Sequence, residues 1–125
     1  MDQIKQKMQV YNEKHGLPPD LDCGGFPNKS WPDWIKQLNV ESENFRNICD
    51  CIKILFPNKI GQINRRISSY GLKHLVERYR KKYVYNGEVI AAMIKCGFKT
   101  SERIGPNCYF NIKTADLRKI KLQDE

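Results

Sequence analysis

The chain lacks any long apolar run. No stretch approaches the roughly 18 consecutive apolar residues that a membrane-spanning helix needs, so no membrane partner is expected. The first residues, MDQIKQKMQVYNEKHG, have charges scattered through them and no apolar core of the kind found in a signal peptide. Together these two absences predict an intracellular protein.

The chain also lacks the residue patterns that carry catalysis. It contains no nucleophile with an adjacent base, no pair of carboxylates in a shared apolar setting and no phosphate-cradling glycine loop. The pair Gly24-Gly25 is too short for such a loop, and no motif places a Ser, Cys or Asp beside His74. The sequence therefore predicts a protein that is not an enzyme and that uses no cofactor.

The cysteines do not form a recognisable disulfide framework or metal site. Their number is odd in a chain without an export signal, which favours reduced thiols. Cys49 and Cys51 are spaced more tightly than the usual C-x2-C zinc knuckle, and on a helix they would point about 200° apart. Buried or half-buried thiols and no metal are expected, with structural zinc as the alternative. The five thiols are those of Cys23, Cys49, Cys51, Cys96 and Cys108.

What the sequence has in abundance is positive charge, and that charge is unevenly placed. The net charge is +8 in 125 residues. Residues 1–58 carry seven Lys or Arg against eight Asp or Glu, whereas residues 59–121 carry fifteen against four. Such an excess repels itself unless a partner neutralises it, and nucleic acid is the commonest such partner because each phosphate contact releases a counterion. A general preference for lysine in the source organism would raise the positive charge of both halves alike. The asymmetry therefore favours a functional role for the charge of the second half.

Residues 1–41 are expected to form a helical N-terminal extension. A narrow apolar stripe at helical spacing predicts a first helix, which the Pro- and Gly-rich stretch 17–29 ends. An N-cap pattern at Ser30 predicts a second helix of about two turns through Leu38. Its two tryptophans are interpreted as packing residues rather than as base-stacking platforms, because this half of the chain is not basic.

Residues 42–125 are expected to form the main domain. Apolar residues at helical spacing predict three of its helices, and Thr114 predicts the start of a last one. The segment after Pro57 predicts a short helix or turn with a basic outer face. Two short β-prone segments joined by a Gly-Pro-Asn turn predict a hairpin. The fold class is thus mostly α with a small β-hairpin (α+β), with helices over 43–56, 69–82, 88–96 and from 114, and hairpin strands over 98–103 and 108–113.

The order of these elements resembles a winged helix-turn-helix domain. The resemblance implies that the helix 43–56 is the first of a trihelical core, 70–82 the supporting helix, 87–96 the recognition helix that enters the major groove, and 99–113 the wing. Once the apolar stripe is removed, the presumed recognition helix keeps two charged and two alanine positions for its outer face, which offers little direct base readout. These positions are Glu88, Ala91, Ala92 and Lys95.

A second resemblance rests on short strings within residues 68–112. They are SYGLKHLVE, YVYNGEVIAAM and, further on, GF and PNCYFNI. Together they are similar to a segment that recurs in small uncharacterised proteins of phages, mobile elements and large DNA viruses. The resemblance implies a source, and with it the cytoplasm or nucleus of a host cell, but no activity.

These observations predict a nucleic-acid-binding protein, with duplex DNA as the favoured partner, affinity dominated by electrostatics and modest sequence specificity. RNA or single strands stay open, because four aromatic residues would stack on bases if exposed: Tyr83, Tyr85, Tyr109 and Phe110. The alternative is a small viral or phage protein that binds an acidic surface of a host protein and inhibits it. A homodimer is also left open. The residues predicted to contact nucleic acid are Arg65, Arg66, Lys73, Arg78, Arg80, Lys81, Lys82, Glu88, Lys95, Lys99 and Arg103.

Overall fold

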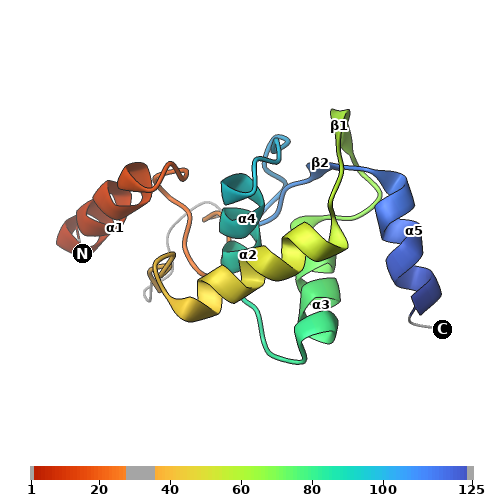
Figure 1. Cartoon of the computed structure of the whole chain (residues 1–125). Helices are drawn as coiled ribbons and strands as arrows, with labels where there is room; N and C mark the ends of the chain where they lie inside the picture. Colours follow the sequence, from red (N-terminus) through yellow and green to blue (C-terminus); the bar gives the residue numbers. More distant parts are fainter. Residues whose placement is uncertain (1, 28–35, 124–125) are drawn as a thin grey trace.

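The computed structural model describes residues 2–27 and 36–123, which form a mixed α+β fold (Figure 1). Helices α1 and α5 lie at opposite ends, and the other three helices form the middle of the molecule. The prediction of a mostly helical chain with a small β component is confirmed. The elements are α1 (Asp2–Lys14), α2 (Glu43–Leu55), β1 (Lys59–Asn64), α3 (Ser69–Arg80), α4 (Asn86–Lys95), β2 (Phe110–Ile112) and α5 (Thr114–Gln123).

Helix α2 forms where the sequence predicts it. The Ser42 side chain accepts a hydrogen bond from the Phe45 amide at 3.0 Å, which satisfies a free N–H at the start of the helix. The apolar positions then fall on one face, which packs against α3 and α4. The helix ends before Pro57, whose ring cannot continue it. The residues buried on this face are Phe45, Ile48, Cys51, Ile52 and Leu55.

Helix α4 is the most deeply buried helix of the described chain. Seven of its residues are buried, including both alanines, because α2 and α3 cover it on two sides. Glu88 stabilises its first turn by accepting a hydrogen bond from the Tyr85 amide at 2.9 Å. Gly97 follows the helix with a φ of +90°, as expected of a glycine that ends a helix.

The N-terminal segment before α2 is part of the same core. Leu17, Leu21 and Phe26 are buried in one apolar cluster with residues of α2, α3 and α4. The contact with α4 is close, because the Gly87 amide donates to the Cys23 carbonyl at 2.8 Å. The cluster includes described residues on both sides of the predicted boundary between residues 41 and 42, among them Val40 and Phe45. Residues of this segment therefore cover part of α4.

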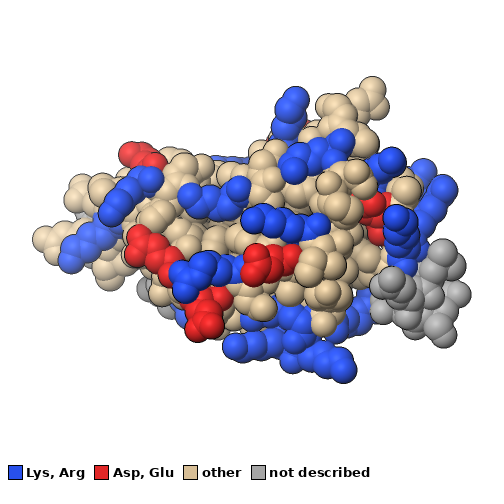
Figure 2. Space-filling model, viewed as in Figure 1, with Lys and Arg blue, Asp and Glu red and all other residues tan. Residues whose placement is uncertain are grey.

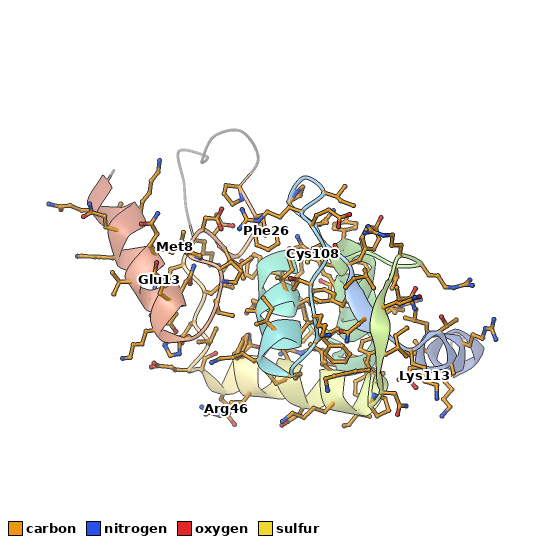
Figure 3. The ribbon with its side chains drawn as sticks, turned by 90° about the horizontal axis from the view of Figure 1, so that it is seen from above. Met8, Glu13, Phe26, Arg46, Cys108 and Lys113 are labelled. Carbon is orange, nitrogen blue, oxygen red and sulfur yellow. The ribbon has the colours of Figure 1, made fainter. Side chains whose placement is uncertain are left out.

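Helix α1 begins this N-terminal segment, and its Met8 lies on the side that faces the rest of the molecule (Figure 3). Its predicted stripe is confirmed only in part, since Met8 is buried and Ile4 is exposed. The second predicted N-terminal helix falls mostly on residues 28–35, outside the described ranges. Residues 36–39, at its expected end, are not helical.

The prediction of a short helix or turn after Pro57 is confirmed at residues 65–66, which form a turn, and is wrong for the residues before them. Those residues form strand β1, which pairs antiparallel with β2 and has an irregular register between Lys59 and Asn64. The isoleucines do not share one buried side, since Ile60 is 36% exposed while Ile67 packs against the core. Gly61 disfavours a helix, whereas β-branched isoleucine favours a strand. Hydrogen bonds fix the pair, because the Asn64 side chain donates to the Ile112 carbonyl at 2.9 Å.

The predicted hairpin over 98–113 is only partly formed. Its two arms meet at isolated bridges, Thr100 with Phe110 and Ile104 with Asn107, while β2 forms its sheet with β1. The segment Tyr83–Tyr85, which has β-prone composition, forms no strand either. Strand pairing here joins segments about 50 residues apart, which local sequence patterns do not reveal.

Helix α5 begins at Thr114, as predicted, and buries Leu117 and Ile120. Its position is held by Asp116, whose carboxylate accepts hydrogen bonds from the Asn58 amide at 3.1 Å and from the Asn58 side chain at 3.2 Å.

No helix in the described part of the chain combines the length and the apolar character needed to cross a membrane.

Candidate functional site

On the face that Figure 2 shows, basic side chains are spread from one end to the other, whereas acidic ones are fewer and lie mostly over the half that includes α1. Most of the residues predicted to contact nucleic acid are exposed. They divide among several places rather than forming one continuous patch. The exposed ones are Arg65, Arg66, Arg78, Lys81, Lys82, Lys95, Lys99 and Arg103, whereas Arg80 and Glu88 are half-buried and Lys73 is buried.

Lys73 does not lie on the outer face of α3, where the sequence predicts it. Only 7% of the residue is exposed, and its ammonium group forms an ion pair with Glu77 at 3.0 Å. The same ammonium group lies 4.4 Å from the centre of the Tyr83 ring. A buried lysine keeps its charge only when such partners replace water. Lys73 therefore belongs to an internal cluster.

Glu77 is the centre of that cluster. It accepts hydrogen bonds from Lys73 and from the Val84 amide at 3.1 Å, and it contacts His74 Nδ1 at 3.0 Å. Burial alone would raise the pKa of Glu77, but the Val84 amide, the Lys73 ammonium group and His74 outweigh it and hold that pKa below its ordinary value. The carboxylate thus stays charged and ties α3 to the segment before α4.

Two of the predicted arginines are already ion-paired at the surface. Arg65 contacts Glu102 at 2.7 Å, and Arg103 makes two hydrogen bonds to Asp20. Exposed pairs of this kind contribute little to stability and exchange readily with other anions. These arginines meet a phosphate only by giving up a carboxylate partner.

The presumed recognition helix, α4, is not presented to solvent. Ala91 and Ala92, expected on its outer face, are completely buried. Glu88 is engaged with the Tyr85 amide and with the Asn44 side chain, which donates to it at 3.2 Å. Lys95 is exposed but lines a different hollow, together with Arg46 and Lys53. In this structure α4 has no free face that a DNA groove would receive, so that expectation is corrected.

Three arginines lie around one hollow, named here the arginine hollow. Its volume is about 350 Å³, and it lies between the turn after β1, helix α3 and helix α5. Arg66, Arg78 and Arg118 supply its charge, and no acidic side chain is found among the described residues that line it. Its remaining lining residues are Ile67, Leu75, Thr114 and Leu117. Guanidinium groups grouped in this way match the planar, multiply hydrogen-bonding surface of a phosphate.

Sequence reasoning found Arg66 and Arg78 of this hollow but did not select Arg118. The missing information was the position of α5, which brings a residue 52 positions away in sequence beside Arg66. Helical periodicity placed Arg118 on the outer side of the last helix, yet it did not show which element that side meets.

A larger hollow of about 590 Å³, named here the tyrosine hollow, was not predicted. It lies where the start of α3, the segment before α4 and the turn at 104–107 meet the segment around Cys23. Most of its lining residues belong to the short strings within residues 68–112 that carry the second resemblance, so those strings come together at this hollow. Its lining residues are Cys23, Gly24, Lys36, Tyr70, Lys73, Tyr83, Tyr85, Asn86, Pro106 and Asn107.

The tyrosines of this hollow combine exposure with fixed orientation. Tyr70 and Tyr83 are 53% and 59% exposed, unusually high for large aromatic residues. The rings of Tyr83 and Tyr85 meet edge to face, with centres 4.9 Å apart. Of the four aromatics considered for base stacking, Tyr83 is exposed and Tyr85 lines the hollow, Tyr109 is half-buried, and Phe110 is fully buried.

No described thiol is prepared for catalysis in the tyrosine hollow. Burial raises the pKa of the Cys23 thiol to about 12, so it stays protonated at neutral pH. The other buried thiol near this region, Cys108, lies beside Phe26 at one end of α4 (Figure 3), and burial raises its pKa to about 12 as well. All five cysteines are free and are buried or half-buried, as predicted.

One half-buried thiol differs from the others. A hydrogen bond from Cys49, with further help from Lys53 and Lys59, lowers the pKa of Cys96 to about 7. Among residues 2–27 and 36–123, no group of three His, Cys, Asp or Glu side chains is arranged to hold a metal ion.

Comparisons with models of known protein families, with curated proteins and with solved structures found no match to this chain.

Proposed function

We propose that this protein binds nucleic acid, with duplex DNA as the main partner, and that it contacts the phosphate backbone at the arginine hollow. The observation that carries the proposal is the grouping of Arg66, Arg78 and Arg118 around a hollow lined by no described acidic residue. The charge of the second half of the chain supports the proposal, because residues 59–121 contain fifteen basic residues and only four acidic ones.

The winged helix-turn-helix relationship is part of this proposal. It is supported by the mutual packing of α2, α3 and α4, and by the return of β2 beside β1, the strand that precedes α3. The mode of contact we propose differs from the usual one, because α4 is covered. Residues at the ends of β1 and α3 and along α5 would meet the backbone instead. Contacts of this type position a protein on DNA without reading its sequence, so modest specificity is expected.

The test is the binding of a fluorescently labelled duplex at two salt concentrations. Affinity should fall by about a hundredfold or more between about 50 and 200 mM salt if several phosphates are contacted. The same titration with single-stranded DNA and with RNA ranks the three partners. An affinity that barely changes with salt would overturn the proposal.

A pair of double variants locates the surface. Arg66→Gln with Arg118→Gln removes two charges from the arginine hollow, whereas Lys7→Gln with Lys14→Gln removes two exposed charges from α1. The first pair should weaken binding about tenfold or more at low salt, and the second should weaken it much less. Equal losses would show that net charge, and not this hollow, governs binding. Co-purification with a protein partner and no binding to any nucleic acid would favour the inhibitor alternative.

A further inference from the structure

The tyrosine hollow has features that backbone binding at the arginine hollow does not use. Aromatic side chains as exposed as Tyr70 and Tyr83 are costly in contact with water, and these two surround one space together with the half-buried Tyr85. The hollow is large enough for a small organic group, since ligand sites commonly have volumes of about 300 to 1,000 Å³. The question is which chemistry would fill it.

The rings favour a flat aromatic group. The rings of Tyr83 and Tyr85 are nearly perpendicular, and a lysine ammonium group lies over one face of each ring. Tyr70 is held in place by an edge-to-face contact with His74, with ring centres 4.6 Å apart. Stacking of a nucleic acid base on such a side chain contributes about 1 to 3 kcal/mol and tolerates any base.

The charges favour an anionic substituent on that group. Lys36 and Lys73 both line the hollow, and no acidic side chain is found among its described lining residues. Lys36 is held over the Tyr85 ring, with its ammonium group 2.6 Å from the Tyr85 hydroxyl. Lys73 also lines the hollow but is ion-paired with Glu77 at 3.0 Å, so Lys36 supplies most of the positive charge there. A phosphate attached to a flat ring matches Lys36, with the Lys73–Glu77 pair beside it.

In the wall of the hollow, the buried Oδ1 of Asn86 lacks a hydrogen-bond partner among the described residues. The Nδ2 of Asn86 donates to the carbonyls of Gly24 and Pro106, each at 3.2 Å, and to Asn107 Oδ1 at 3.0 Å. Since two of these acceptors are main-chain carbonyls, the orientation of the amide is fixed and Oδ1 is directed away from them. That Oδ1 is buried and has no partner among the described residues. Buried acceptors without partners are rare and costly. Asn86 is one of the residues that line the hollow, so this amide adds a polar group to its wall.

We infer that the tyrosine hollow binds a single unstacked nucleotide, with the base against the tyrosines and the phosphate beside Lys36 and Lys73. The nucleotide is either an unpaired residue of a nucleic acid strand or a free mononucleotide. The first case rests on the proposed function, and the second does not. Both hollows border α3, with Tyr70 and Lys73 on one and Leu75 and Arg78 on the other.

The test compares a fully paired duplex with the same duplex carrying one unpaired, extrahelical nucleotide. The protein should bind the second about fivefold to a hundredfold more tightly, which is the contribution expected of one stacked base. Tyr83→Leu should abolish this preference and leave the affinity for the paired duplex unchanged. Tyr79→Leu is the matched control, because Tyr79 is an exposed tyrosine of α3 outside the hollow. Because Tyr83 also contacts Lys73 and Tyr85, circular dichroism first establishes that each variant is folded as the wild-type protein is.

A second arm uses adenosine and cytidine monophosphates, detected by ligand-observed NMR. Binding that Tyr83→Leu removes and Tyr79→Leu keeps would assign the hollow to free nucleotides even if no nucleic acid binds. A protein that binds duplex in a salt-dependent way, but neither prefers the unpaired nucleotide nor binds a mononucleotide, would overturn this inference and leave the proposed function standing. A preference that persists in Tyr83→Leu would also overturn it.

Discussion

Glu77 is a half-buried carboxylate that organises part of a surface for which the sequence predicts only positive charge. It neutralises Lys73, contacts His74 and holds the Val84 amide at the start of the segment that leads to α4. The sequence contained the signal for the first contact, because Lys73 and Glu77 are four residues apart on a predicted helix. It did not reveal the burial of Lys73, which depends on Tyr83 folding back over it from another segment.

Replacing this carboxylate should weaken the fold. Glu77→Gln keeps the size of the side chain but removes the charge that faces Lys73, so the free energy of unfolding should fall by about 1 to 3 kcal/mol at pH 7. Glu102→Gln is the control, because its ion pair with Arg65 is exposed and should matter far less. Urea unfolding monitored by circular dichroism measures both.

The pH dependence of this difference has a definite sign. The pKa of Glu77 is lower in the folded chain than its ordinary value of 4.5, so the carboxylate stabilises the fold above that value. The contribution is lost as the pH falls through the folded-state pKa. The difference between the wild-type protein and Glu77→Gln should therefore shrink below about pH 4.5. A difference that stays constant down to pH 3 would contradict the role given to this residue.

Helix α4 shows what an apolar pattern does and does not predict. Its position in the sequence follows from its periodicity and from Gly97, and the prediction of a helix is confirmed. The burial of α4 could not be predicted in the same way. Its apolar stripe predicts one buried side, whereas most residues of the helix are buried in the structure. The extra cover comes from residues 21–26, which a Pro- and Gly-rich composition presents as a mere connection.

The close approach of this cover depends on Gly87. A Cβ atom at this position would lie 1.7 Å from the Asp22 carbonyl oxygen, so any side chain forces the two segments apart. Gly87→Ala should lower the free energy of unfolding by about 1 to 3 kcal/mol, as overpacking does. Gly61→Ala is the control, since a Cβ there meets nothing within 4 Å. Equal thermal midpoints for the two variants would show that residues 21–26 are not packed against α4 as described.

Strand β1 is the element that sequence reasoning misassigned. The spacing of Ile60, Ile63 and Ile67 suits a helix, and no local signal indicates a partner strand. The strand exists because β2 returns to it and because Asn64 and Asn111 donate side-chain hydrogen bonds to main-chain carbonyls across the pair. Pairing over such a distance is a property of the folded chain and not of its local composition.

For the whole molecule, the sequence predicted that the second half is basic and that its charges lie outside an apolar core, and most of the predicted basic residues are exposed. It did not predict how they are grouped. Arg65 and Arg103 are paired with carboxylates, Lys73 is buried, and α5 completes the arginine hollow with Arg118. The tyrosine hollow was missed for the same reason, because its residues come from segments far apart in the sequence.

The most direct test of nucleic acid binding at the arginine hollow is the slope of log affinity for duplex DNA against log salt concentration. Each phosphate contact contributes a slope of about −0.9. The slope should therefore become shallower by about 2 in the Arg66→Gln, Arg118→Gln double variant and stay close to the wild-type slope in the Lys7→Gln, Lys14→Gln control. A slope that is the same in the wild-type protein and the arginine variant would contradict the account.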